Sequence, residues 1–342
     1  MRIKLTVLSP IHIGSGEEIS PTEYFIDGNK FIRIDMNGLF NDSRFGGYFE
    51  SFISNAKNQR YLGDLVKNRD LLLHYPLYSF NLSPGVDNLK NKIAVKAFVK
   101  SAGRVYIPGS SLKGSLLSAI IWKKGKEAKI KDIKDLTSIL DIIIGNISNR
   151  PLNNKFKFSR WLDVSDSELK FPSEVLELSL IKVENLLVAQ RKIQSIPVLC
   201  ETLKRGITFE TEFKSCLVYD GKIIDEFGKL SELDILKACH EFYSKIYEKE
   251  KYFGNQKLKL PDLPSNLDYF LVRLGQGSTC LSTSLLILAE DLGINNYEVK
   301  RPPIKGRHLP PIKPGEFPRT KKLVQNQPKG LSMGWAKIEK IE

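Results

Sequence analysis

The sequence of 342 residues contains few cysteines, and none of them form a pair at metal-ligand spacing. Neither a zinc ribbon nor a disulfide framework is indicated, because the four cysteines are scattered without a CxxC pair: Cys200, Cys216, Cys239 and Cys280. Cys239 and its neighbour His240 would point to different faces of a helix, which suits no shared metal. We therefore expect buried thiols, no metal and no cofactor.

Long apolar runs are also missing. No stretch approaches the roughly 18 apolar residues of a membrane span, and the start, MRIKLTVLSP, has no apolar core ending in a cleavage site. Hydrophobic residues make up 42% and charged residues 27% of the chain, as in a folded protein of about two domains. These features predict a cytoplasmic protein without a membrane partner.

A nucleotide phosphate loop is absent from the stretch that most resembles one, YIPGSSLKGSLL at 106–117. The loop needs a lysine directly after a glycine, whereas here Lys113 precedes Gly114. Apolar residues at helical spacing predict a helix instead, with Ser110 or Ser111 as its N-cap: Leu112, Leu116 and Ile120. A lysine in the first turn is unfavourable for the helix dipole but suits an anion, so phosphate binding and a simple capped helix start both remain open.

Acidic residues are nearly absent from 299–330, which holds nine Lys or Arg, seven prolines and only Glu316 as an acid. The prolines exclude a long helix, and the like charges favour extension along an anionic partner. A solvated loop is the alternative. The stretch contributes to the net charge of +13 and points to a polyanion as the ligand.

The remaining patterns mix strands and helices. A strand at 2–8 and a hairpin around Asp27-Gly28 precede a helical region at 36–75. A strand at 207–213 is followed by a helix at 230–251 and by a second strand, glycine loop and helix from 269. This order favours an α+β fold of two ferredoxin-like units. The aromatic signature of ordinary RNA-recognition modules is missing from RGITFETEF at 205–213, which argues against a base-stacking sheet.

Several motifs, taken in order, carry a resemblance to a known family. They are LTVLSPIHIGSGEEISPTEYFID, IPGSSLKGSLLSAI, VSDSEL, ETLKRGITFE, VRLGQGS and FPRTKKL…GLSMGWAKIE. With these residues the chain resembles the RAMP superfamily of CRISPR effector proteins. Within it, the chain is similar to the type III-A Csm complex subunits that cap the 3′ end of the CRISPR RNA.

The resemblance implies two RRM-like RAMP domains with helical insertions, which we place at 1–195 and 196–342. It implies CRISPR RNA, a neighbouring RAMP backbone subunit and a host nuclease as candidate partners, and a role in antiviral defence without catalysis. Glycine-rich loops would contact the RNA backbone. The predicted RNA-binding residues are His12, Gly14, Ser15, Gly16, Ser110, Ser111, Lys113, Gly114, Arg191, Gly275, Gln276, Gly277, Ser278, Lys305, Arg307, Arg319, Lys321 and Lys322.

Two other functions fit the sequence. A RAMP endoribonuclease that processes precursor RNA could use His12 or a carboxylate such as Asp35 as general acid or base. A protein scaffold that recruits a separate nuclease could use the basic stretch 299–330 to contact protein rather than RNA. Both remain alternatives at this stage.

Overall fold

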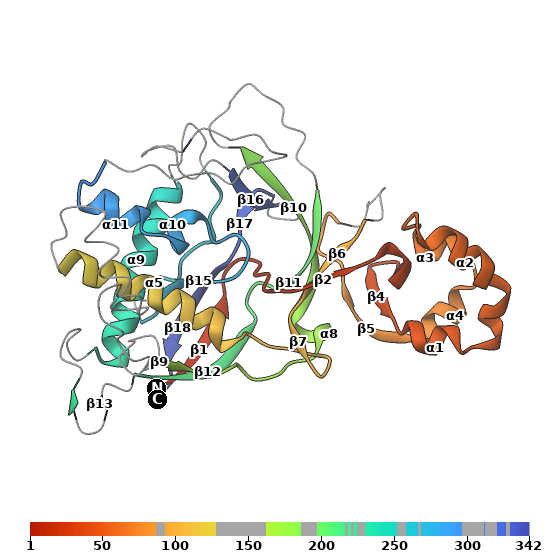
Figure 1. The fold of residues 1–342 in the computed structure, drawn as a ribbon, viewed down its shortest axis with the longest axis horizontal. Helices are drawn as coiled ribbons and strands as arrows, with labels where there is room; N and C mark the ends of the chain where they lie inside the picture. Colours follow the sequence, from red (N-terminus) through yellow and green to blue (C-terminus); the bar gives the residue numbers. More distant parts are fainter. Residues whose placement is uncertain are drawn as a thin grey trace, which may run out of the picture.

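The computed structural model describes residues 1–86, 93–127, 162–185, 197–215, 218–219, 222–223, 230–251, 258–265, 268–295, 311, 320–325 and 329–341. Strands and helices are mixed throughout, and most of the described apolar side chains share one large core. The predicted α+β class is confirmed. Figure 1 shows two large sheets side by side, with helices over one of them and a small lobe at the far end of the other.

The first sheet is antiparallel, in the order β15 (Phe270–Arg273), β18 (Trp335–Lys340), β1 (Arg2–Val7), β12 (Thr208–Ser215) and β9 (Leu162–Val164). Strand β1 lies in the middle because it pairs with β12 along one edge and with β18 along the other. Its residues Ile3, Leu5 and Val7 alternate with polar residues and bury one face of the strand. The order β18-β1-β12-β9 is that of a ferredoxin-like unit, with β15 added at its edge.

Two long helices pack against each other beside this sheet, α5 (Gly109–Glu127) and α9 (Glu232–Lys251). Helix α5 lies between β1 and β9 in the sequence, and α9 follows β12. This is the alternation of strands and helices found in a ferredoxin-like unit. The predicted apolar stripe of α5 is confirmed, since Leu112, Leu116 and Ile120 are buried. Two short helices, α10 (Cys280–Thr283) and α11 (Leu286–Asp291), complete this layer.

The second large sheet has the order β17 (Leu331–Ser332), β16 (Thr320–Val324), β10 (Leu176–Asn185), β11 (Val198–Leu203), β6 (Val95–Phe98) and β2 (Gly14–Ile19). All pairs are antiparallel except β11 with β6. The short helix α8 (Pro172–Val175) leads into β10. Short β-ribbons pair β7 (Lys100–Ser101) with β8 (Arg104–Val105) and β13 (Val218–Tyr219) with β14 (Lys222–Ile223).

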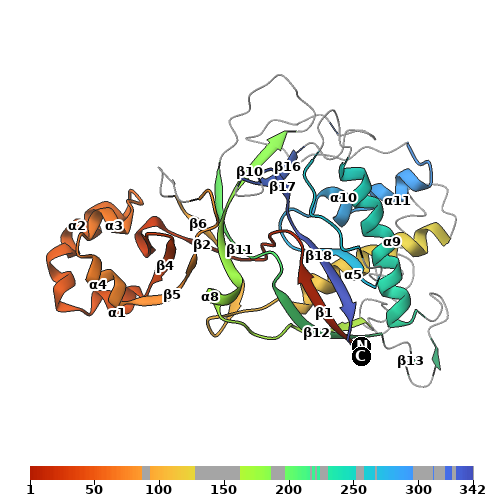
Figure 2. The same ribbon diagram turned by 180° about the vertical axis from the view of Figure 1, so that it is seen from behind.

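A separate lobe is built on the predicted hairpin, which is confirmed as β3 (Tyr24–Asp27) and β4 (Lys30–Ile34), joined by β5 (Pro76–Asn81). Its helical part consists of α1 (Met36–Phe40), α2 (Phe49–Ala56), α3 (Leu62–Leu65) and α4 (Arg69–His74), with 3-10 turns η1 (Pro21–Glu23) and η2 (Ser43–Tyr48). A small hydrophobic core of its own holds the lobe together. The lobe projects from the body in both views (Figures 1 and 2).

Both large sheets take strands from each side of residue 195. The first combines β1 and β9 with β12, β15 and β18, and the second combines β2, β6 and β10 with β11, β16 and β17. The chain crosses between the sheets several times, so its two halves are interleaved. The division into domains at 1–195 and 196–342 stays a prediction.

Candidate nucleic-acid interface

Two glycine segments from opposite ends of the chain meet at His12. The backbone carbonyl of His12 accepts a hydrogen bond of 2.7 Å from the Gln276 amide, and the two residues form an isolated antiparallel bridge. Gly275 has φ +68, and a Cβ on it would lie 2.3 Å from the His12 carbonyl oxygen. Only glycine permits this approach. The predicted segments 12–16 and 275–278 therefore belong to one site.

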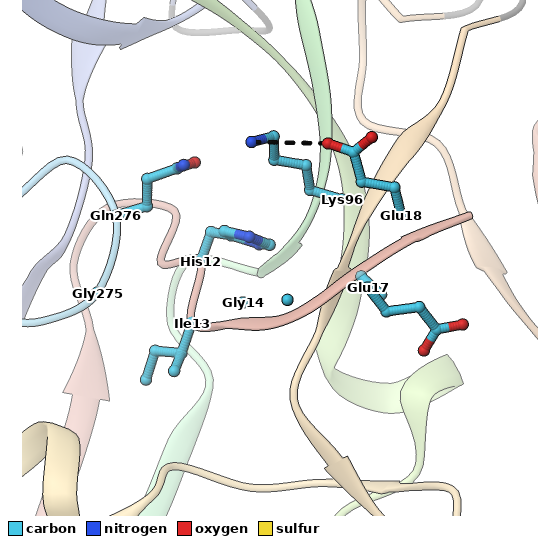
Figure 3. Close-up of a pocket in the computed structure, with 10 residues that line it drawn as sticks. His12, Ile13, Gly14, Glu17, Glu18, Lys96, Gly275 and Gln276 are labelled. Atoms are coloured by element: carbon cyan, nitrogen blue, oxygen red, sulfur yellow. Dashed lines mark ion pairs between the residues drawn. The ribbon is translucent and has the colours of Figure 1, made fainter. Parts of the chain in front are cut away.

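A cleft of about 340 Å³ opens at this junction, between β2, β6 and the loop after β15. It is lined by His12, Ile13, Gly14, Gly16, Glu17, Glu18, Lys96, Ala97, Gly275 and Gln276. Figure 3 shows the His12 ring between Gln276 and the Lys96–Glu18 pair, with Ile13 pointing the other way. The predicted glycines form the walls, and the side chains that reach into the cleft are polar or charged.

The His12 ring is held by the backbone of β11. Its Nδ1 lies 2.7 Å from the carbonyl oxygen of Glu201, and only 3% of the residue is exposed. Burial lowers the pKa of His12 below its usual 6.5, with the Glu201 carbonyl acting in the opposite direction. The ring is therefore neutral at pH 7, which excludes a resident positive charge for phosphate at this position.

Glu201 itself anchors the floor beneath His12. Its carboxylate is fully buried and accepts hydrogen bonds from the Tyr78 hydroxyl at 2.7 Å and the Phe98 amide at 2.8 Å. Lys100 forms an ion pair with the same carboxylate. A buried carboxylate with this many donors is rigid, so it fixes β6, β11 and the lobe strand β5 relative to one another.

Lysines on the second sheet supply the positive charge of the cleft. Lys96 lies on β6 opposite Cys200, pairs loosely with Glu18 at 3.9 Å and keeps 39% of its side chain exposed. Lys322 on β16 is half-buried, and burial together with Lys96 lowers the pKa of Lys322. Lys96 lines the cleft, whereas Lys322 lies outside its lining, and the positive charges of both lysines help to lower the pKa of His12. Lys322 was predicted from the sequence, whereas Lys96 was missed because a lysine in an alternating strand has the pattern of an ordinary solvated face.

The loop 275–278 is braced from below by a buried ion network. The Arg273 guanidinium donates to the carbonyl oxygens of Gly277 at 2.6 Å and Met333 at 3.1 Å, and it pairs with Glu250 of α9. Lys321 pairs with the same carboxylate, and all three side chains are fully buried. The prediction of an RNA contact for Lys321 is therefore wrong, because a phosphate cannot reach a sealed ammonium. Burial and the Arg273 charge lower the pKa of Lys321 to about 7.

The third predicted segment borders this loop without joining the cleft wall. Ser115 of α5 donates a hydrogen bond of 2.6 Å to the Arg273 carbonyl, which places the start of α5 beside β15. The predicted N-cap is wrong, because the helix begins at Gly109 and Ser110 lies inside its first turn. The Gly109 amide instead donates to the Asp166 carboxylate at 2.7 Å, so an internal acid already occupies part of the helix N-terminus.

The start of α5 at Gly109 packs directly against the VSDSEL segment at 164–169. A Cβ on Gly109 would lie 2.1 Å from the Val164 carbonyl oxygen, and the Ile107 amide donates to the Ser167 hydroxyl at 2.8 Å. Ser111 and Lys113 stay partly exposed, and Ser110 and Gly114 are exposed, one turn from the Arg273 contact. Four predicted residues lie outside the described part of the chain: Arg191, Lys305, Arg307 and Arg319.

The alternative catalytic carboxylate has a structural role. Asp35 caps α1 in the lobe by accepting from the amides of Asn37 at 3.1 Å and Gly38 at 3.2 Å. Within the described residues, no group of three or more His, Cys, Asp or Glu side chains could hold a metal ion. Over the same residues, no helix has the length and apolar character of a membrane span.

Comparisons with known proteins agree on one family. The model of the RAMP superfamily matches residues 4–272. A CRISPR system Cms protein Csm5 from Streptococcus thermophilus is 26% identical over 315 residues, covering 86% of this chain and 83% of that protein. The Csm5 protein of Methanocaldococcus jannaschii is 25% identical over 400 aligned positions, covering 100% and 89%.

Solved structures show the same fold. A chain of the cryo-EM structure of a Csm–crRNA–target RNA ternary complex of a type III-A CRISPR–Cas system matches with a TM-score of 0.70 at 22% identity, over 99% of this chain and all of that one. The crystal structure of T. onnurineus Csm5 matches with a TM-score of 0.65 at 20% identity, over 97% and 99%. The similarity therefore extends over whole chains.

Proposed function

The chain belongs to the RAMP superfamily, and from this premise we propose that it is the RNA-binding subunit of a type III-A CRISPR effector complex that holds the 3′ portion of the CRISPR RNA. The curated relatives are Csm5 proteins, and one structural neighbour is part of a complex with crRNA. The partners of this chain would be CRISPR RNA and an adjacent RAMP backbone subunit. Its contribution would be to RNA maturation and assembly of the complex.

The observation that carries the proposal is the cleft at His12. Gly14 and Gly16 line the cleft without side chains and leave room for a polymer backbone to approach. Lys96 lines the same cleft and Lys322 adds positive charge on the same sheet, which suits phosphate. Such a surface reads backbone and shape rather than bases. RNA-binding residues in this proposal are those around the cleft, together with the exposed start of α5.

We propose further that the subunit is not a nuclease. General acid–base cleavage needs two titratable groups placed around the scissile phosphate, and of the two candidates from the sequence only His12 lines the described cleft. Asp35, the other candidate, is engaged as a helix cap in the lobe. No observation favours the endoribonuclease or the protein scaffold over RNA holding.

The test is reconstitution of the effector complex with wild-type chain, without the chain, and with a Lys96→Ala/Lys322→Ala variant. Sequencing of the bound RNA should show intact, uniform 3′ ends for wild type, and shortened or heterogeneous ends without the chain and with the variant. Lys57→Ala, an exposed lysine of the lobe, is the matched control and should behave as wild type. Identical 3′ ends in all four samples would refute the proposal.

Purified chain incubated with labelled precursor RNA separates the alternatives. Cleavage that disappears in His12→Ala would establish a nuclease. Absence of RNA binding at low salt, together with retention of a nuclease by the complex, would favour the scaffold.

A further inference from the structure

The two nitrogens of the His12 ring have different and fixed roles. Nδ1 faces the Glu201 carbonyl oxygen at 2.7 Å, and a carbonyl oxygen can only accept, so Nδ1 carries the proton. In a neutral ring the other nitrogen, Nε2, is then a pure acceptor. The β11 backbone therefore sets the tautomer of His12 and leaves one lone pair available.

That lone pair is open to the cleft. In the described part of the chain only Nδ1 of His12 has a hydrogen-bond partner, and the residue lines the cleft. The nearest wall is Gly14, where a Cβ would lie 3.0 Å from Nε2. The missing side chain at position 14 keeps the acceptor uncovered, although most of the ring is packed into the fold.

An acceptor at this place selects a particular chemistry. A phosphate oxygen also accepts and would be repelled by the Nε2 lone pair, whereas the neighbouring ammonium groups of Lys96 and Lys322 suit phosphate. A ligand that matches both presents an anion beside a hydrogen-bond donor. The backbone of RNA does so at every nucleotide, through phosphate and the ribose 2′-hydroxyl, and DNA lacks that donor.

We propose that Nε2 of His12 accepts a hydrogen bond from the 2′-hydroxyl of one ribose, which makes the cleft select RNA over DNA. This assignment rests on the proposed function, because it names the specificity of the same cleft. His12 is then a specificity-determining residue that acts through its acceptor nitrogen, and Gly14 is the position that keeps that nitrogen accessible.

The test uses the full chain and a single-stranded RNA in which each 2′-hydroxyl in turn is replaced by fluorine, which removes the donor and keeps an RNA-like sugar. Fluorescence anisotropy at low salt should find one position where the replacement weakens binding by wild type about 3- to 10-fold, the range of one neutral hydrogen bond. In His12→Phe the same replacement should have no effect. His74→Phe, at an exposed histidine of the lobe, should retain the full wild-type effect.

Gly14→Ala provides a second route that leaves the ring in place. Its Cβ would cover Nε2, so the 2′-fluoro effect at that position should vanish there too. If wild type binds RNA but no single replacement costs more than 2-fold, or if the effect persists in both variants, the assignment is overturned while RNA holding stands. If wild type binds no RNA at all, the proposed function falls together with it.

Discussion

Replacing Glu250 by glutamine should test how the buried ion network supports the cleft. The carboxylate sits between the Arg273 guanidinium and the Lys321 ammonium, and the relative exposure of all three side chains is 0%. Glutamine has nearly the same shape, so the variant removes the negative charge, leaves the Arg273 guanidinium without a counter-charge and lowers the pKa of Lys321 still further below its usual range.

The expected cost follows from this burial. Removing one partner of a buried ion pair typically destabilises a protein by about 3–5 kcal/mol, because the remaining charge stays desolvated. With an unfolding entropy of about 2.1 cal/mol/K per residue, a chain of 342 residues should then lose roughly 4–7 °C in its melting temperature. Since Arg273 also holds the Gly277 carbonyl, binding at the cleft should weaken as well.

The assay is urea unfolding and calorimetry of the wild type, Glu250→Gln and a matched exposed pair variant, Glu210→Gln. Glu210 pairs with Arg2 with about half of each side chain exposed, so its loss should cost less than about 1 kcal/mol. Adding Lys321→Met to Glu250→Gln should restore part of the stability by removing a buried amine that has lost its partner. A Glu250→Gln chain as stable as Glu210→Gln, or no gain from the second change, would refute the reasoning.

Three further outcomes are expected. Lys96→Ala and Lys322→Ala should each flatten the logarithmic salt dependence of RNA affinity by about 0.7, and an unchanged slope in binding titrations would remove that lysine from the phosphate contacts. Gly275→Ala should abolish tight RNA binding. It should also destabilise the fold by more than the roughly 1–3 kcal/mol that backbone strain alone costs, because the added Cβ would also clash with the His12 carbonyl. Gly206→Ala, at φ +82 with open space around it, should show the strain alone in the same unfolding experiment. Burial lowers the pKa of His12 below 6.5, so below that pH the unfolded chain binds a proton that the folded chain does not. Stability should therefore fall from pH 7 to pH 5, and His12→Phe should lose this part of the decline.

Local patterns predicted the local structure well. The alternation at 2–8, the Asp27-Gly28 turn and the apolar stripe of α5 each depend on neighbours within a few residues, and the structure confirms all three. The two glycine segments were also identified as binding candidates. Their meeting at His12 could not be predicted, because no periodicity records which loops a sheet brings together.

The failures share a physical cause. The helix cap of α5 comes from Asp166, far along the chain, so a search of adjacent residues selected Ser110 and Ser111 instead. Lys321 lies in a run of basic residues that indicated a solvated surface, yet its counter-charge is Glu250 on a distant helix. The charges within one segment do not reveal whether a distant acidic residue will pair with a lysine and stabilise it in the interior.

The central strand β1 pairs with β12 on one side and with β18 on the other, so that Ile3 lies opposite both Thr211 and Lys340, and the two ends of the chain sit together in Figure 1. During synthesis on the ribosome β1 would therefore wait first for β12 and then, much longer, for β18. Until then its backbone edges are open to mispairing. The first sheet is thus complete only once β18 has reached the open edge of β1, so its closure depends on a contact between strands that are far apart in the sequence.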